Sequence, residues 1–247
     1  MKYPGLIATK GRAGQSSTIE NALKENLPIR LIVEPQDALD YCREYPTAEI
    51  YELPENNKGI TYARNFCLNM ARREGFPWFW MLDDDIKQLY IVIDGKVHKA
   101  PMKEVFARAE ALITMQPTVA IGALEYQQYA WSAKKQMTFN SYCDQVVLVS
   151  AERTKPLQYR EDCKEDRDFV LQVLQMGMDT CRTSWLAFSS PKNGSNKGGL
   201  HDAYKGGLEN HWSAKMVKLW PGVCELKTKK DGRPDVKIHW KKMRSGV

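Results

Sequence analysis

The chain has 247 residues, of which 43% are hydrophobic and 27% charged, and its formal net charge is +6. This composition is typical of a globular protein that buries a core without disulfide staples. No apolar run approaches the roughly 20 residues of a membrane span, and the N-terminus lacks a signal-peptide segment. The six cysteines form no CxxC pair, so a zinc ribbon is not expected. We therefore expect a cytoplasmic protein.

The first part of the chain predicts alternating strands and helices. Short apolar runs predict strands at residues 3–8, 29–33 and 50–53, and amphipathic patterns predict helices at 16–26 and 35–45 between them. This βαβαβ order implies a parallel sheet with helices on both faces. Ligands of such sheets bind beyond the carboxyl ends of the strands.

Two features predict an anionic ligand at that edge. Residues 9–14, Thr-Lys-Gly-Arg-Ala-Gly, combine two glycines and two cations directly after the first strand, without the spacing of a Walker loop. A helix predicted at 61–74 carries Arg64 and Asn65 in its first turn, where backbone amides favour phosphate. For Arg64 and Asn65 the alternative is an exposed pair with no ligand.

The run Trp-Phe-Trp-Met-Leu at 78–82 predicts a buried strand, and Asp83, Asp84 and Asp85 follow it directly. Adjacent carboxylates repel one another, and burying them without a partner is costly. In extended backbone Asp83 and Asp85 point the same way, so one divalent cation could bind both. The alternative is a charged loop that caps the next helix.

The remaining pattern predicts a hairpin around Asp94-Gly95, a helix at 105–115, and strands at 119–124, 145–149 and 181–189. Residues 125–142 are rich in aromatic side chains, which either pack over the core or line an acceptor pocket.

A second acidic pair, Glu165 and Asp166, opens a predicted helix that Gly177 ends. Carboxylates are electrostatically favourable at a helix start, which is also a purely structural explanation for them. Residues 190–199 form a glycine-rich loop that contains Lys197, and His201 follows it. His201 is either a metal ligand or a surface residue without a ligand.

The end of the chain is basic. Residues 225–247 hold three acids and eight basic residues, namely Lys227, Lys229, Lys230, Arg233, Lys237, Lys241, Lys242 and Arg244. With Trp240 among them, these residues suit a polyanion such as nucleic acid. A solvated tail is the alternative that charge alone leaves open.

In order along the chain, Gly59-Ile-Thr-Tyr-Ala-Arg64-Asn65, the acids Asp83–Asp85 and the pair Glu165-Asp166 resemble the motifs of inverting glycosyltransferases of GT-A fold. In those enzymes the acids after the strand form the DxD motif. The resemblance implies a three-layer α/β/α sandwich around a mostly parallel mixed sheet, with residues 1–247 as a single domain.

A narrower resemblance is to the TET-associated glycosyltransferases of bacteriophages. It involves Lys10-Gly11-Arg12, Asn57-Lys58-Gly59-Ile60, Leu82-Asp83-Asp84-Asp85-Ile86 and Asp166-Arg167-Asp168-Phe169. It implies transfer of a sugar from a nucleoside diphosphate donor, with UDP expected, to the hydroxyl of 5-hydroxymethylcytosine in DNA. For a phage protein the compartment would be the host cytoplasm.

This resemblance also implies roles for individual residues. Mn²⁺ or Mg²⁺ would be held by Asp83, Asp85 and His201. Asp166 would take the proton of the acceptor hydroxyl, with Glu165 and Asp162 as rivals. The donor would be bound by Lys10, Arg12, Arg64, Asn65, Asp83, Asp84 and Lys197.

Three other functions fit the same residues. They are a glycosyltransferase with a protein or carbohydrate acceptor, a metal-dependent nucleotidyltransferase, and a DNA-binding module without activity. For a DNA acceptor the target base must leave the stack, and Trp131 or Tyr129 could receive it.

Overall fold

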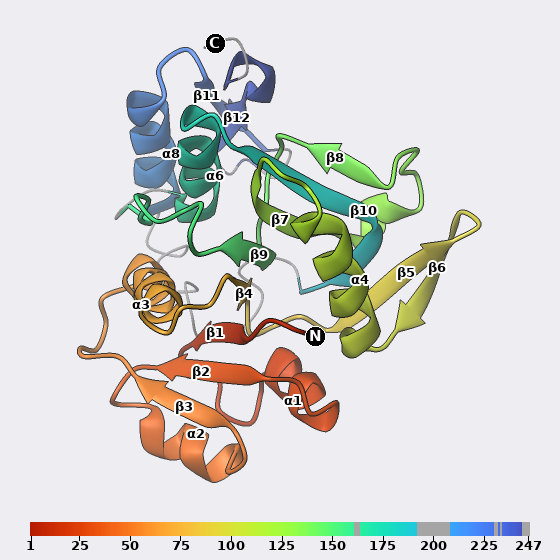
Figure 1. Ribbon diagram of the computed structural model, residues 1–247. Helices are drawn as coiled ribbons and strands as arrows, with labels where there is room; N and C mark the ends of the chain where they lie inside the picture. The colour runs from red at the N-terminus through yellow and green to blue at the C-terminus, as the bar shows by residue number, and fades with distance from the viewer. Residues whose placement is uncertain (161–163, 192–207, 230–231, 233, 244–247) are drawn as a thin grey trace.

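A computed structural model describes residues 1–160, 164–191, 208–229, 232 and 234–243 of the chain. Within these residues the main sheet has ten strands, in the order β3-β2-β1-β4-β9-β7-β10-β5-β6, with β8 beside β10 (Figure 1). The strands are β1 (Gly5–Thr9), β2 (Ile29–Val33), β3 (Glu49–Glu52), β4 (Trp78–Leu82), β5 (Gln88–Ile93), β6 (Lys96–Ala100), β7 (Val119–Tyr126), β8 (Met137–Phe139), β9 (Val146–Ser150) and β10 (Asp179–Ser189).

The sheet is mixed, and its first half is parallel. Strands β3, β2, β1 and β4 run the same way, so Thr9, Val33 and Leu82 end at one edge. Strand β9 runs antiparallel to β4 and begins at that edge, where Val146 pairs with Leu82. The segment that precedes β9 therefore lies beside the segment that follows β4, and the Asp83 amide donates to the Gln145 carbonyl at 2.8 Å.

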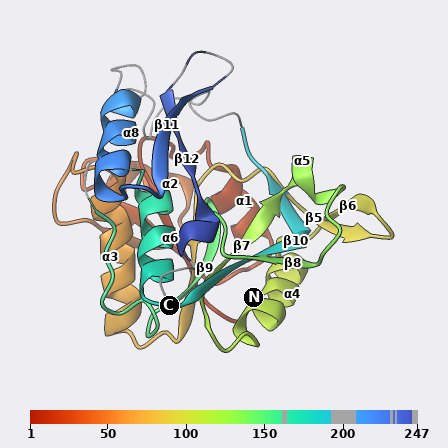
Figure 2. The ribbon, with the colours of Figure 1, turned by 90° about the horizontal axis from the view of Figure 1, so that it is seen from above.

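Helices cover both faces of the sheet, as Figures 1 and 2 show. Buried side chains of α1 (Ser17–Lys24), α2 (Ala38–Glu44) and α4 (Met102–Thr114) pack with Trp80 on one face. Those of α3 (Ile60–Arg73) and α6 (Glu165–Gln175) pack with Phe79 on the other face. A short helix, α5 (Gln127–Ala130), follows β7. This arrangement confirms the predicted three-layer α/β class.

Local sequence signals fix several element ends. Ser16 caps α1, and its side chain accepts a hydrogen bond from the Ile19 amide. Asp94 and Gly95 both have positive φ, +50° and +71°, which is the geometry of a tight two-residue hairpin turn. Within the described residues no helix is both long and apolar enough to cross a membrane.

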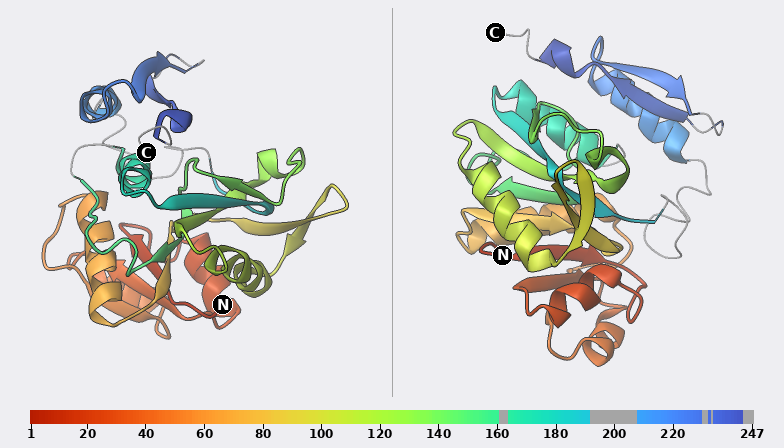
Figure 3. Two further views of the ribbon diagram at one scale, coloured as in Figure 1. Left: turned by 45° about the horizontal axis from the view of Figure 1, so that its top comes forward. Right: turned by 90° about the vertical axis from the view of Figure 1, so that its right-hand side faces the viewer.

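The C-terminal part differs from the sequence expectation. It folds into α8 (Leu208–Leu219), an antiparallel hairpin of β11 (Cys224–Thr228) and β12 (Pro234–Ile238), and the 3-10 helix η1 (Trp240–Met243). These elements lie beyond α6, away from the main sheet (Figure 3). A separate apolar cluster joins them to Leu171 of α6, with Met216, Trp220, Cys224 and Val236 as its other buried members.

The alternative of a solvated tail is therefore wrong for the described part of residues 225–247. The charged sequence did not indicate a hairpin, but β11 and β12 form one, and its inward side chains Cys224 and Val236 are apolar and buried. The Trp220 indole also donates to the Asp168 carboxylate at 2.8 Å, which ties α8 to the start of α6.

Candidate active site

Three charged segments meet at the carboxyl edge of the parallel strands. The first is the loop after β1, the second is the acidic turn after β4, and the third is the pair of acids at the start of α6. The loop holds two glycines with positive φ, Gly11 at +62° and Gly14 at +68°. The Gly11 amide donates to Asp37 at 2.8 Å and the Arg12 amide to the Tyr41 hydroxyl at 3.1 Å. Contacts with and near α2 thus hold the loop in place.

Asp84 is the anchor of the acidic turn. Its side chain is buried, accepts a hydrogen bond from the Thr9 hydroxyl at 2.6 Å, and forms an ion pair with Arg12. Its backbone carbonyl accepts from the Ser16 hydroxyl at 2.5 Å. Burial raises the pKa of Asp84 above its ordinary value, and Arg12 opposes that shift. Asp84 joins the turn to the first loop, while its predicted contact with the donor stays a prediction.

Asp83 is linked to the second acidic pair through one arginine. The Arg64 Nη2 lies 3.0 Å from Asp83 Oδ1, and its Nη1 lies 3.0 Å from Glu165 Oε1. Burial raises the pKa of Asp83 to about 7; Arg64 opposes this shift, whereas the neighbouring Asp85 and Asp84 add to it. Burial likewise raises the pKa of Glu165. The two acidic pairs predicted separately from the sequence therefore form one cluster.

Asp85 lies in a turn with Asp84, and its Oδ2 is 3.4 Å from Arg12 Nη1. The expectation that Asp83 to Asp85 continue the extended backbone is therefore wrong. Arg12 and Arg64 also supply part of the positive charge that the sequence argument assigned to a metal. Repulsion between the three acids does not by itself require a metal ion.

The cluster nevertheless retains an excess of negative charge. The two guanidiniums contact four carboxylates, those of Asp83, Asp84, Asp85 and Glu165. Oxygen ligands with uncompensated charge suit Mg²⁺ or Mn²⁺, so Asp83 and Asp85 fit the predicted metal. Within the described part of the chain, no group of three His, Cys, Asp or Glu side chains is arranged to hold a metal ion. The predicted third ligand, His201, lies outside the described residues, as do Lys197 and Asp162.

Two other residues that were predicted to bind the sugar donor form hydrogen bonds within the protein. Lys10 Nζ donates to Asn57 Oδ1 at 2.6 Å and pairs with Glu34 at 3.0 Å, which brings the first loop to the segment before α3. Asn65 exchanges two hydrogen bonds of 2.8 Å with the Tyr159 backbone. Lys10 therefore lies at the expected edge, and Asn65 fixes the chain that leads to α6. Their contact with a donor stays a prediction.

Asp166 faces a small cavity at the centre of the cluster, together with Arg64, Asp83 and Asp144. Its Oδ1 accepts a hydrogen bond from the Arg167 amide at 2.8 Å. The carboxylate proposed as a base from the sequence thus lies beside the acids proposed for the donor. Its role as a base is not tested by this arrangement.

Sequence reasoning missed Asp144. It precedes the buried strand β9, so the antiparallel pairing with β4 brings it to the edge that Asp83 occupies. Burial raises the pKa of Asp144 to about 7, and Asp166 adds to the shift. The only signal in the sequence was an acid directly before an apolar strand, the same pattern in reverse as Asp83 after β4.

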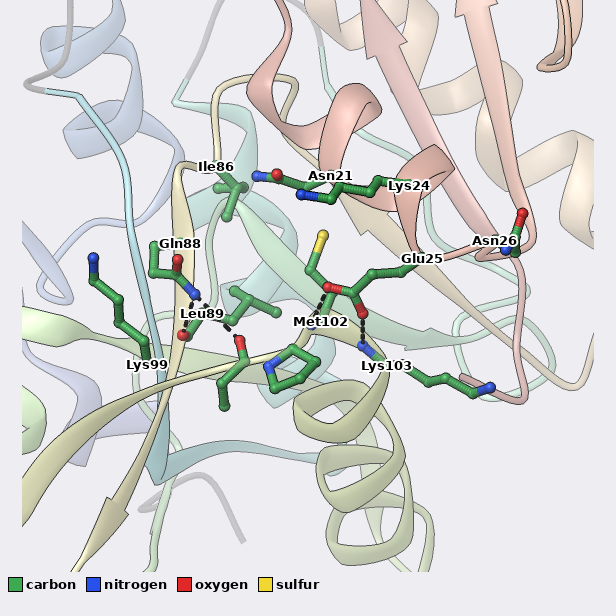
Figure 4. A pocket seen from close by; sticks show the side chains of 12 residues that line it. Asn21, Lys24, Glu25, Asn26, Ile86, Gln88, Leu89, Lys99, Met102 and Lys103 are labelled. Carbon is green, nitrogen blue, oxygen red and sulfur yellow. Dashed lines mark hydrogen bonds between the residues drawn. The ribbon is translucent and has the colours of Figure 1, made fainter.

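A larger cavity of about 870 Å³ opens beside the cluster. Tyr129 lines it and Trp131 does not, which separates the two aromatic candidates for an acceptor pocket. Another cavity, of about 630 Å³, lies between α1, the β5–β6 hairpin and α4 (Figure 4). There Glu25 accepts hydrogen bonds from the amides of Met102 and Lys103 at 2.9 and 2.8 Å. The anion-binding end of α4 is thus already occupied by a carboxylate.

Comparison with solved structures gives remote similarities. A197 from STIV has 15% identity and a TM-score of 0.45, over 78% of this chain and 87% of that one. A putative nucleotide-diphospho-sugar transferase from Desulfovibrio desulfuricans G20 has 11% identity and a TM-score of 0.44, over 73% of this chain and 78% of that one. A search of curated proteins finds no match.

The family comparison is more informative. The model of the TET-Associated Glycosyltransferase family matches residues 3–199, a span that includes the first loop, the acidic turn and the pair Glu165-Asp166. The mixed α/β sheet with helices on both faces is the GT-A-like architecture expected for such an enzyme. The chain is a glycosyltransferase and belongs to the TET-associated glycosyltransferase family.

Proposed function

We propose that the chain transfers a sugar from a nucleoside diphosphate donor, with UDP as the expected nucleotide, to the hydroxyl group of 5-hydroxymethylcytosine in DNA. The family match carries this proposal, because it spans every charged segment of the cluster. The basic C-terminal hairpin supports a polyanionic acceptor. The proposed compartment is the cytoplasm, which is the host cytoplasm if a phage encodes the chain.

The donor side of the proposal rests on the cations at the carboxyl edge. Lys10 and Arg12 follow β1, and Arg64 lies near the start of α3 and contacts Asp83 after β4. They would bind the diphosphate and orient the anomeric carbon towards Asp166. A Mn²⁺ or Mg²⁺ ion held by Asp83 and Asp85 would supply further stabilisation of charge on the departing diphosphate.

The acceptor side needs a group that takes a proton. In the proposed step the acceptor oxygen forms a bond to the anomeric carbon, and the bond from that carbon to the diphosphate oxygen breaks. Asp166 takes the hydroxyl proton, and the nucleoside diphosphate leaves with the bonding electrons. Displacement on the face opposite the leaving group inverts the anomeric centre.

Incubation with a panel of sugar nucleotides tests this function. The unaltered chain, Mn²⁺ and each donor are mixed with DNA that contains cytosine or 5-hydroxymethylcytosine, and the nucleosides are analysed by mass spectrometry. The expected product is a hexosyl adduct of the hydroxymethylated DNA only, with release of UDP. If the chain modifies a peptide or glycan but neither the cytosine DNA nor the hydroxymethylated DNA, the proposed DNA acceptor is wrong. Release of pyrophosphate would indicate a nucleotidyltransferase.

A further inference from the structure

Asp144 connects the acidic cluster to the larger cavity. Within the part of the chain that the structure describes, it is the residue that lines both the small cavity of Asp83 and Asp166 and the cavity of about 870 Å³. A molecule in the larger cavity therefore reaches the acidic cluster past Asp144. Two of the proposed donor residues, Arg64 and Asp83, line the small cavity with Asp144, and Arg12 contacts the neighbouring Asp84 and Asp85.

One wall of the larger cavity is aromatic. The Tyr126 ring packs against Phe188 at a centroid distance of 4.6 Å and against Tyr129 and Tyr142 at 6.3 Å each. Tyr142 is held in turn by Arg182, whose guanidinium lies 3.8 Å from the ring centroid. Tyr129 is 52% exposed, so its ring is available to a ligand. This wall is a preformed surface on which a base can stack.

A second part of the cavity wall is basic and comes largely from the C-terminal hairpin. Arg167 lines the cavity, and so do Lys227 of β11, Lys229 directly after β11 and Lys237 of β12. Their side chains are 48%, 29% and 56% exposed. Among the described residues, these four cations and Lys164 outnumber the three acids with which they form ion pairs, Asp235, Glu209 and Glu225. The wall thus has positive charge left for the phosphates of a polyanion.

The inner end of the cavity has an unused acceptor. Asp144 Oδ2 accepts a hydrogen bond from the Tyr126 hydroxyl at 2.9 Å. Asp144 Oδ1 is buried and has no hydrogen-bond partner among the residues that the structure describes. A buried oxygen without a donor is unfavourable, so this atom is suited to a ligand that brings an N–H group.

We propose that this cavity is the acceptor site, where a modified cytosine turned out of the DNA stack lies against Tyr126 and Tyr129 and donates its amine to Asp144 Oδ1. Lys227, Lys229 and Lys237 hold the phosphates of the same strand. This assignment rests on the proposed function, since it requires a DNA acceptor. It deepens that function by naming the residues that bind the base and its backbone.

The basic wall is tested with the double variant Lys227→Ala, Lys237→Ala. At a saturating concentration of UDP-sugar we expect the KM for hydroxymethylated DNA to rise at least tenfold, while the donor KM stays within twofold. The dependence of DNA affinity on salt concentration should also become flatter, because fewer counterions are released on binding. The matched control is Lys96→Ala, Lys155→Ala, which removes the same charge from the start of β6 and from the segment after β9.

Asp144 is tested by acceptor selectivity. Asn at this position keeps the shape and offers an amide N–H, which suits the carbonyl of uracil where cytosine carries its amine. We expect Asp144→Asn to raise kcat/KM for 5-hydroxymethyluracil relative to 5-hydroxymethylcytosine by about tenfold or more, in the range of a specific base contact. A merely structural role would lower both values equally. Tyr129→Ala should raise the DNA KM by about tenfold through lost stacking.

The results separate this inference from the proposed function. If the unaltered chain modifies hydroxymethylated DNA, and every variant has the same DNA KM and the same base selectivity as the control, the acceptor site alone is overturned. Absence of transfer to any DNA by the unaltered chain would overturn the proposed function, and the acceptor site with it.

Discussion

Arg64 contacts Asp83 at 3.0 Å, which connects the second turn of α3 to the acidic turn after β4. The other terminal nitrogen of the same guanidinium contacts Glu165 at the start of α6. Arg64 is buried, and the side chains of Asp83 and Glu165 are 30% and 13% exposed. One side chain thus sets the relative position of the proposed donor site and the proposed base.

Arg64→Lys should lower both stability and activity. A lysine offers one ammonium group where the guanidinium reaches two carboxylates, so one of them is left without its partner. Breaking a buried ion pair costs about 3–5 kcal/mol, and we expect a loss at the lower end of that range in the free energy of unfolding by urea. Arg108→Lys is the control. Its pair with Glu104 is exposed, so its effect should stay below about 1 kcal/mol.

The neighbours Asp84 and Asp85 should behave differently. Asp84→Asn disturbs the buried contacts with Thr9 and Arg12, so we expect a loss of about 1–3 kcal/mol in the free energy of unfolding. Asp85→Ala should leave stability nearly unchanged and abolish metal-dependent binding of the donor, as measured by calorimetric titration with UDP and Mn²⁺. A chelator should have the same effect on the unaltered chain. Equal donor affinity of Asp85→Ala and the unaltered chain would exclude Asp85 as a metal ligand.

Asp166→Asn should retain the donor and lose the reaction. The amide cannot take the acceptor proton, so we expect kcat to fall about 10²–10⁴-fold, while the affinity for UDP measured by calorimetry is unchanged. Asp168→Asn, two residues further along α6, is the contrasting variant. It weakens the contact with Trp220 and should lower stability while the folded enzyme keeps its kcat. If Asp166→Asn retains its turnover, the base is another residue.

The C-terminal hairpin should make stability depend on acid pH. Burial raises the pKa of Asp235. Arg167 at 2.7 Å and Lys164 at 3.4 Å lower this pKa by more than burial raises it, so the pKa lies well below its ordinary value. Because the folded pKa is below the unfolded value of about 4, this stabilisation is complete above that pH and is lost as the pH falls through the folded value.

In Asp235→Asn, the free energy of unfolding should therefore depend less steeply on pH between about pH 4, the unfolded pKa, and about pH 2. The measurement is urea denaturation across this range. Asp94→Asn, in the exposed turn of the β5–β6 hairpin, is the matched control and should leave the slope as it is. An identical slope for Asp235→Asn and the unaltered chain would mean that the ion pairs do not contribute to stability.

Most elements up to β10 followed from the sequence because each has a strong local signal, whereas α5 and β8, within residues 125–142, were not predicted. The run at 78–82 is uniformly apolar, and the structure has β4 at Trp78–Leu82 with all five residues buried. Asp94-Gly95 specified its turn through the positive φ that these residues tolerate. The C-terminal hairpin was missed because its strands alternate lysines with few apolar residues, and its apolar face exists only against α6 and α8.

The kinds of chemical group at the site could be predicted from the order of residues, since carboxylates that directly follow a buried strand or open a helix must lie at element ends. Which of these groups contact one another depends on the fold. Arg64 joins two acidic pairs that are about 80 residues apart, a separation set by chain connectivity and not by any local rule. Asp84 turned out to be an anchor, and Asp144 became part of the site. The reason is that antiparallel pairing of β9 with β4 brings the start of one strand to the end of the other.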